Sequence, residues 1–216
     1  LGDVYKRQIL LIPFSILILI FSAMMGLQSL INSQSYIENL LTEIMLDTHE
    51  LITSEFRHRL SIHEQLNQAN KIYFQQRGSE TNLHGINDLM LNQLNSFKDI
   101  DAVYFSSKDN WFSGFARFGS QLVHMYSNEE TNYSVHFERF SEDQTSTELL
   151  QIIPDFHATQ NAWYAEASAD IKKGWGSAFS YDVLPTLALP NSLVITDTEG
   201  KKMGVVGNDL SLIHIS

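Results

Sequence analysis

The residues best suited to binding chemistry lie between Asp155 and Ala167, where a loop leads into a short predicted helix. Trp163 and Tyr164 are neighbours there, so their rings point about 100° apart around the helix axis. One ring can face a sheet while the other lines the space beside it, and each carries a hydrogen-bond donor. The sequence leaves two interpretations open: a turn that packs in the core, or one wall of a ligand site.

Two aspartates could add acid–base or ionic chemistry to this region. Asp182 and Asp209 lie on separate predicted strands that can converge near Trp163. A pair of carboxylates can act as general acid and general base, so a membrane-tethered hydrolase is the alternative function. Asp209 has two further interpretations, as a solvated residue at the end of a strand or as a contact to a ligand.

The other reactive side chains form no catalytic or metal-binding pattern in the sequence. The chain has no cysteine, which excludes a disulfide framework, a thiolate nucleophile and a cysteine-based zinc site. His58 and His63 miss the spacing of a helical metal pair, and we expect both to be solvated. A Gly-rich phosphate loop and a Gly-x-Ser-x-Gly motif are also absent. We therefore predict no catalytic residue, no metal and no cofactor.

The net charge of the chain limits the classes of molecule to which it can bind. The chain of 216 residues has a formal charge of −11. An acidic surface repels nucleic-acid phosphates and anionic lipid head groups, so we predict no nucleic-acid binding. The length allows a membrane anchor and one domain of ordinary size.

A membrane anchor is predicted at residues 9–27, which contain no charged side chain and are mostly Ile, Leu, Phe and Met. At 1.5 Å per residue, a helix of this length just crosses the hydrocarbon core of a bilayer. No Lys or Arg occurs from Gly26 to Phe56. A flank without basic residues is typical of the outer side of a membrane, so we expect the rest of the chain outside the cytoplasm.

Residues 28–77 are predicted to form one long amphipathic helix, roughly 70 Å in length if it is unbroken. Apolar residues recur seven apart along it, at Leu30, Ile37, Ile44 and Leu51. The pattern is an incomplete coiled-coil heptad, so we expect the helix to pack on its own domain, with a dimer contact near the membrane. A purely structural coiled coil is disfavoured by three polar residues farther along, Asn67, Gln68 and Asn70.

Residues 78–210 are predicted to form an α+β domain built on an antiparallel sheet. A loop over residues 77–85 precedes a helix over residues 86–97, and a surface loop covers residues 141–147. Alternation of apolar and polar residues and the turn signals between them predict the strands. These are residues 101–107, 111–117, 121–126, 133–140, 177–181, 192–196 and 203–206.

Two motifs carry a family resemblance. Phe156, Asn161, Trp163, Tyr164 and Ala167 have the spacing of an aromatic residue, an Arg, a Trp-Tyr pair and an Ala. Residues 204–210 read Gly-Val-Val-Gly-Asn-Asp-Leu and match a Gly-Val-x-Gly-x-Asp strand. Both resemble the signature of the double Cache family, the extracytoplasmic ligand-sensing domains of bacterial receptors. The resemblance covers roughly residues 27–210.

The resemblance implies a fold, a location and a function. The fold would be a PAS-like subdomain, the membrane-distal half of a double Cache module, with no enzymatic activity of its own. The function would be small-molecule sensing at the bacterial plasma membrane, with the domain facing the periplasm or exterior. A chemoreceptor, a histidine kinase or a diguanylate cyclase would provide the output. The long helix would carry the signal and form a homodimer.

The resemblance also implies the ligand contacts, namely Phe156, Asn161, Trp163, Tyr164, Tyr181, Asp182 and Asp209. In amino-acid-binding members of the family, an Arg holds the ligand carboxylate and the downstream Asp holds the ammonium. Asn161 stands at the Arg position here and Phe156 replaces the usual Tyr. We therefore expect an amine or a small neutral polar ligand, unless Arg117 or Lys172 restores the missing positive charge.

The two ends of the chain stand apart from the domain. Residues 1–8 and 211–216 resemble translated adapter sequence of the kind found at the edges of metagenomic assemblies. We expect both segments to be artefacts, and the chain to be an internal fragment of a longer receptor. A second sensor subdomain, a second membrane span and the output domain would then follow residue 210.

Overall fold

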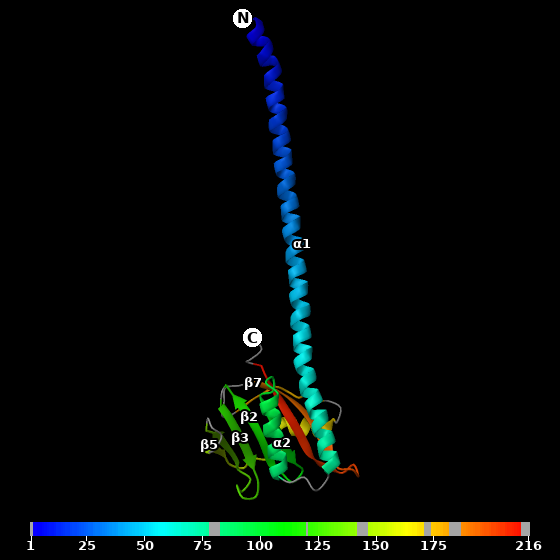
Figure 1. Ribbon diagram of the computed structural model, residues 1–216, viewed down its shortest axis with the longest axis vertical. Helices are drawn as coiled ribbons and strands as arrows, with labels where there is room; N and C mark the ends of the chain where they lie inside the picture. Colours follow the sequence, from blue (N-terminus) through cyan, green and yellow to red (C-terminus); the bar gives the residue numbers. More distant parts are fainter. Residues whose placement is uncertain are drawn as a thin grey trace. The chain divides into compact units, whose positions relative to one another are not determined.

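The computed structural model describes residues 2–77, 83–119, 121–141, 147–170, 174–181 and 187–212. The chain divides into two units, Leu1–Phe56 and Arg57–Ser216. One helix, α1 (Gly2–Arg77), supplies the first unit and continues into the second (Figure 1). The long helix predicted over residues 28–77 is therefore confirmed, and it begins well before residue 28.

The first unit is a single helical segment with apolar side chains exposed along its described length. Pro13–Ser33 is long and apolar enough to cross a membrane, with a mean hydropathy of 2.1 and no buried side chain. It is the one such segment in the described part of the chain. It overlaps the predicted span at 9–27, and Pro13 is accommodated inside the helix.

The second unit is built on an eight-stranded antiparallel sheet with the order β5-β4-β3-β2-β1-β8-β7-β6. Its strands are β1 (Ala102–Ser107), β2 (Phe112–Phe118), β3 (Gln121–Ser127), β4 (Val135–Phe140), β5 (Thr147–Ile153), β6 (Phe179–Ser180), β7 (Leu187–Thr196) and β8 (Lys202–Ser211). β8 pairs with β1, so the last strand of the chain lies in the middle of the sheet. The helical elements are α2 (Leu83–Ser96), η2 (Ala158–Gln160) and α3 (Ala162–Ala169).

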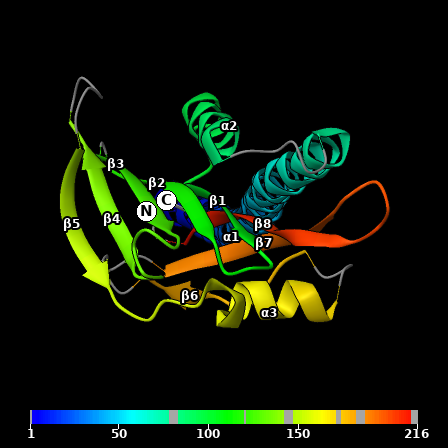
Figure 2. The same ribbon diagram turned by 90° about the horizontal axis from the view of Figure 1, so that it is seen from below.

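Each face of the sheet is covered by helix and has its own core (Figure 2). Residues 57–77 of α1 and the whole of α2 lie on one face. Leu66, Phe74 and Met90 from these helices pack there on Phe105 and Ile195. α3 lies on the opposite face, where its first turn packs on strands from the middle of the sheet. The predicted α+β architecture, with a PAS-like antiparallel sheet, is confirmed.

Several boundaries differ from those predicted, for physical reasons. α2 begins at Leu83 rather than at residue 86, so Gly85 lies inside it. A helical Gly costs about 1 kcal/mol, which burial of Ile86 and Met90 outweighs. β7 begins at Leu187 rather than at residue 192, and it passes through Pro190. Its neighbour on one side is the two-residue edge strand β6, and a missing N–H is tolerated close to a sheet edge.

The strand β5 was not predicted at all. It forms the edge of the sheet, and its side chains are nearly all exposed, so its sequence lacks the apolar–polar alternation of a half-buried strand. β6 is shorter than the predicted strand over residues 177–181. β8 extends through Ser211, a residue that sequence analysis placed in the terminal adapter segment.

Candidate functional site

The sheet face under α3 holds a cavity of about 280 Å³. Strands β1 to β5 contribute to its floor, and the loop before α3, α3 itself and residues 179–181 form its walls. Most lining side chains are aromatic or aliphatic. They are Tyr104, Phe112, Met125, Val135, Phe137, Ile153, Phe156, Asn161, Ala162, Trp163, Phe179, Ser180 and Tyr181. An apolar cavity with a few polar groups is typical of small-molecule sites.

Trp163 and Tyr164 point to different sides of α3, as expected for neighbours on a helix. The Trp163 ring lines the cavity and packs edge-on against Tyr104, with ring centroids 4.7 Å apart. Tyr164 is buried but is not among the lining residues. The Lys202 Nζ lies 4.3 Å from the centroid of the Tyr164 ring, and Lys202 does not line the cavity either. The structure therefore assigns Trp163 to the candidate site and Tyr164 to its support.

The loop before α3 is held by a residue that sequence analysis did not select. Asn110, in the turn between β1 and β2, has a φ of 65° and directs its side chain to this loop. Its Nδ2 donates to the Phe156 carbonyl at 3.3 Å, and its Oδ1 accepts from the Thr159 N–H at 3.4 Å. Phe156 then packs on Phe112 with centroids 5.2 Å apart. The available sequence signal was an Asn in a predicted hairpin turn, a residue that tolerates positive φ.

Asn161 directly precedes α3, at its N-cap position, and its side chain makes no capping hydrogen bond. Its Nδ2 donates to the His157 carbonyl at 3.3 Å. The side chain is half-buried and lines the cavity, as the family position implied. It offers a bound molecule an amide, without a positive charge.

Asp209 is buried at the base of the site rather than solvated at a strand end. Tyr104 Oη donates to Asp209 Oδ1 at 2.7 Å, and Tyr181 Oη donates to Oδ2. Burial raises the pKa of Asp209 to about 7, although the two phenol hydrogen bonds oppose this rise. Both phenols line the cavity, so the carboxyl group lies directly behind its polar wall.

Two glycines explain how β8 brings Asp209 so close to β1. A Cβ on Gly207 would lie 2.3 Å from the ring of Tyr104, and a Cβ on Gly204 would lie 2.1 Å from the Ser106 carbonyl oxygen. Any larger residue at 207 would push Tyr104 away from Asp209. The Gly-Val-x-Gly-x-Asp pattern therefore has a steric cause in this fold.

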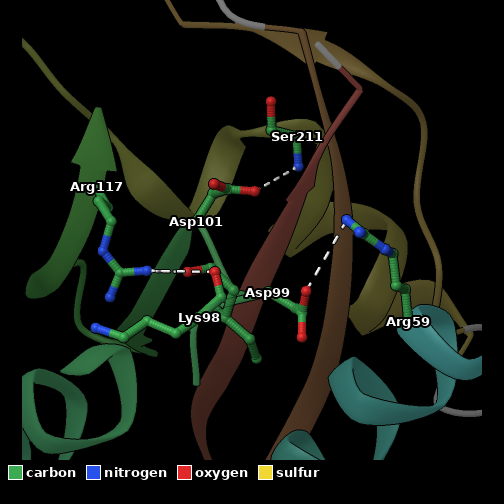
Figure 3. Close-up of polar contacts among 7 residues, drawn as sticks. Arg59, Lys98, Asp99, Asp101, Arg117 and Ser211 are labelled. Carbon is green, nitrogen blue, oxygen red and sulfur yellow. Dashed lines mark hydrogen bonds and ion pairs between the residues drawn. The ribbon is translucent and has the colours of Figure 1, made fainter. Parts of the chain in front are cut away.

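Arg117 does not supply a positive charge to the site (Figure 3). Its guanidinium lies on the α2 face of the sheet, where it donates to the carbonyl oxygens of Leu94, Lys98 and Ile100. No Lys or Arg occurs among the described residues that line the cavity. Lys172 and Asp182, the other expected contributors, lie outside the described residues.

Both His58 and His63 were expected to be solvated. His58 is exposed as expected, whereas the expectation was wrong for His63. His63 is fully buried between α1 and the sheet, where its Nδ1 lies 2.6 Å from Asn208 Oδ1. Its partner is distant in sequence, so helical spacing alone could not reveal the contact. In the described part of the chain, no three His, Cys, Asp or Glu side chains cluster as a metal site would require.

Comparison with known proteins places this fold among bacterial sensors. A solved structure of methyl-accepting chemotaxis protein X is 14% identical, with a TM-score of 0.58, over 83% of this chain and 65% of that one. The ligand-binding domain of Campylobacter jejuni chemoreceptor Tlp3 in complex with L-valine is 15% identical, with a TM-score of 0.50, over 76% and 56%. The ligand-binding domain of the Pseudomonas aeruginosa PAO1 chemoreceptor PctB in complex with L-Arg is 16% identical, with a TM-score of 0.46, over 76% and 53%.

The likeness establishes the fold, which is that of the Cache-type sensor domains of chemoreceptors. The resemblance predicted from sequence is thereby confirmed. No protein-family model and no curated protein matches the chain. The chain spans about half the length of the solved chemoreceptor domains it matches first.

Proposed function

We propose that this chain is part of an extracytoplasmic small-molecule sensor in a membrane-bound bacterial signalling receptor. The observation that carries the proposal is the aromatic cavity under α3, with Asp209 buried behind its polar wall. The fold supports it, because chemoreceptor ligand-binding domains share it. The output would be a chemoreceptor, histidine kinase or diguanylate cyclase domain.

The hydrolase alternative has less support. Both oxygens of Asp209 accept hydrogen bonds from phenols, and the carboxyl group is shielded from the cavity by them. Its suggested partner, Asp182, lies outside the described residues. The structural neighbours are ligand-binding domains, which favours binding over catalysis.

The ligand class follows from the charges around the cavity. A bound carboxylate would meet no Lys or Arg among the described lining residues, and burying an unpaired charge costs several kcal/mol. A bound ammonium that displaces the Tyr181 phenol would reach the Asp209 carboxylate, and such a charge-assisted bond contributes roughly 1.5–3 kcal/mol. An aromatic face beside it adds about 0.5–2 kcal/mol. We infer that the ligand is a small amine with an apolar body.

A matched series of four molecules with the same phenyl body tests this inference. Calorimetry of residues 1–216 in detergent micelles would compare 2-phenylethylamine, 2-phenylethanol, 3-phenylpropanoate and L-phenylalanine. We expect the amine to bind most tightly, the alcohol more weakly and the two carboxylates weakest. Trp163→Leu should weaken binding of the amine, whereas Tyr164→Leu should leave it unchanged, because Tyr164 does not line the cavity. Binding of L-phenylalanine as tight as that of the amine, unchanged in Asp209→Asn, would show that the site is elsewhere.

We extend the proposal to membrane attachment and assembly. Pro13–Ser33 would cross the bacterial plasma membrane, and Arg57–Ser216 would form the membrane-distal half of a double sensor module outside it. The apolar stripe at residues 37, 44 and 51 would pair with a second copy of the chain. Exposure of these side chains on the helix supports this assignment.

A further inference from the structure

The contact between α1 and the sheet is polar where an apolar contact would be expected. His63, Asn67 and Asn70 lie on the buried side of α1, four and three residues apart. Three further polar residues face them, namely Asn191 of β7, Asn208 of β8 and Gln93 of α2. We call these six residues the polar seam.

Hydrogen bonds cross the polar seam at three levels. His63 Nδ1 and Asn208 Oδ1 are 2.6 Å apart, and Asn208 Nδ2 donates to the His63 carbonyl at 3.0 Å. Asn67 Nδ2 donates to Asn191 Oδ1 at 2.6 Å. At the third level, Gln93 Nε2 donates to Asn70 Oδ1.

Two of these levels keep buried amide atoms that take no part in these hydrogen bonds. Asn67 Oδ1 and Asn191 Nδ2 are buried without a partner among the described residues, and so are Asn70 Nδ2 and Gln93 Oε1. Turning over both amides of the Asn70–Gln93 pair would reverse the direction of its hydrogen bond without losing it. Asn67 Nδ2 also donates to the Asn191 backbone carbonyl at 2.8 Å, so Asn67 and Asn191 can exchange donor and acceptor only if α1 shifts on the sheet. Interlocked apolar side chains offer no such alternative. Phe74, stacked on Phe105 with centroids 4.9 Å apart, makes an apolar contact of that kind one turn farther along α1.

The polar seam is joined to the cavity by neighbouring residues of one strand. Asn208 and Asp209 are consecutive in β8, so their side chains lie on opposite faces of the sheet. Asp209 binds the cavity phenols, whereas Asn208 binds His63.

A second connection runs around the sheet edge through residues 174–181, which we call the strap. Its Tyr181 binds Asp209, and at its other end the Trp175 indole donates to Glu64 Oε1 of α1 at 2.8 Å. The Trp175 ring also packs on His63 with centroids 5.6 Å apart.

We propose that the polar seam is a two-state contact whose amides exchange partners as α1 shifts on the sheet, and that occupancy of the cavity selects the state. This inference rests on the proposed sensor function. A ligand ammonium at Asp209 would replace the Tyr181 phenol as partner of Oδ2. That change would reposition the strap and β8, which both contact the His63–Asn67 turn of α1. A ligand can shift such an equilibrium only by this kind of differential contact.

The chain has three tryptophans, which allow the cavity and the polar seam to be observed separately. The chain, labelled with 5-fluorotryptophan and held in lipid nanodiscs, gives one ¹⁹F resonance each for Trp111, Trp163 and Trp175. Trp163 reports the cavity and Trp175 reports the polar seam. The cavity is perturbed in two ways, by adding 2-phenylethylamine and, without any ligand, by Tyr181→Phe. We expect both perturbations to move both resonances.

The seam itself is tested by Asn67→Leu combined with Asn191→Leu. Replacing both partners of a buried pair by apolar groups is often neutral or stabilising, so the thermal unfolding midpoint should not fall. Trp163 should still respond in this variant, whereas Trp175 should lose most of its displacement. Gln65→Leu, on the exposed side of the same turn, should leave both responses intact. If the double variant fails to fold, Glu64→Ala removes the Trp175 acceptor at the surface, and Trp175 should again lose most of its response.

Each outcome has a definite reading. In the unmodified chain, a shift of the Trp163 resonance without a shift of the Trp175 resonance would overturn the two-state seam. A full shift of the Trp175 resonance in the double leucine variant would also overturn it. If the amine moves neither resonance while Tyr181→Phe moves both, the proposed ligand class is wrong and the seam stands.

Discussion

At Asp209 a carboxyl group and two phenols share one buried hydrogen-bond network, and burial raises the pKa of the acid to about 7. The folded state therefore holds this proton more tightly than the unfolded state, whose carboxyl has a pKa of 3.8. As the pH rises from about 4 to about 7, the free energy of unfolding should fall, by roughly 4 kcal/mol in total. Above that range the ionisation of Asp209 should cause no further fall in the free energy of unfolding.

Asp209→Asn isolates this contribution. The variant cannot ionise, so it should lose less stability than the natural protein between pH 4 and pH 8. Burial lowers the pKa of His63, and lowers that of His124 to about 4, but both histidines are present in each protein. Only the difference between the two pH profiles of the thermal midpoint therefore reports Asp209. Parallel profiles would contradict the raised pKa.

The same ionisation should control the binding of a cation. An ammonium binds the ionised carboxylate, so the affinity of 2-phenylethylamine should rise about tenfold from pH 6 to pH 8, then level off. The neutral 2-phenylethanol gains nothing from the charge and serves as the matched ligand. Calorimetry at the two pH values measures both. Equal pH dependence of the two ligands would mean that Asp209 does not face the bound amine.

The position of a side chain was predictable where it belongs to a sequence motif. It was not predictable where its partner comes from a distant segment of the chain. Trp163 and Asn161 line the cavity, and their family positions had indicated this. His63 was expected in solvent, because nothing in a helical pattern reveals a partner such as Asn208, 145 residues away. Arg117 was a candidate cation for the site, yet register places it on the opposite face of the sheet.

At the scale of elements, Arg117 ties β2 to the end of α2. Its guanidinium donates to three carbonyl oxygens there, those of Leu94, Lys98 and Ile100, where a cation also meets the negative end of the helix (Figure 3). Arg117→Ala should lower the free energy of unfolding by about 1–3 kcal/mol. Arg139→Ala removes an exposed pair with Glu148 instead, and should cost about 1 kcal/mol or less. Similar losses of stability in the two variants would show that Arg117 does not anchor α2.

The elements themselves were largely predictable because their apolar periodicity is local. The hairpin β1–β2 and the helix α2 follow directly from it, since Ile86, Met90 and Leu94 recur on one buried side. β5 escaped prediction because Leu149, Leu150 and Ile152 are exposed at the sheet edge and do not alternate with polar residues. Its position is determined by pairing with β4, which no local pattern encodes.

At the scale of the molecule, the helical first unit leaves a stripe of apolar side chains exposed. Leu30, Ile37, Ile44 and Leu51 are 69%, 52%, 52% and 70% exposed. We expect a second copy to cover the part beyond the membrane. The chain has no cysteine, so Ile44→Cys and Leu51→Cys introduce single thiols that should form disulfide-linked dimers in membranes. His49→Cys, about 140° around the helix from Ile44, is the control. Cross-linking equal at all three positions would argue against a defined helix pair.

Topology is the remaining whole-molecule prediction, and it depends on the flanks of Pro13–Ser33. No Lys or Arg occurs from Gly26 to Phe56, and the positive-inside rule places such a flank outside the cytoplasm. Alkaline phosphatase fused after Leu212 should therefore be active, because it needs the oxidising exterior to form its disulfides. A fluorescent protein that folds only in the cytoplasm should stay dark at the same position. Adding positive charge to the flank, by Tyr36→Lys with Glu43→Lys, should lower phosphatase activity. A bright cytoplasmic reporter after Leu212 would place the sheet and its cavity inside the cell, where an extracytoplasmic sensor could not be.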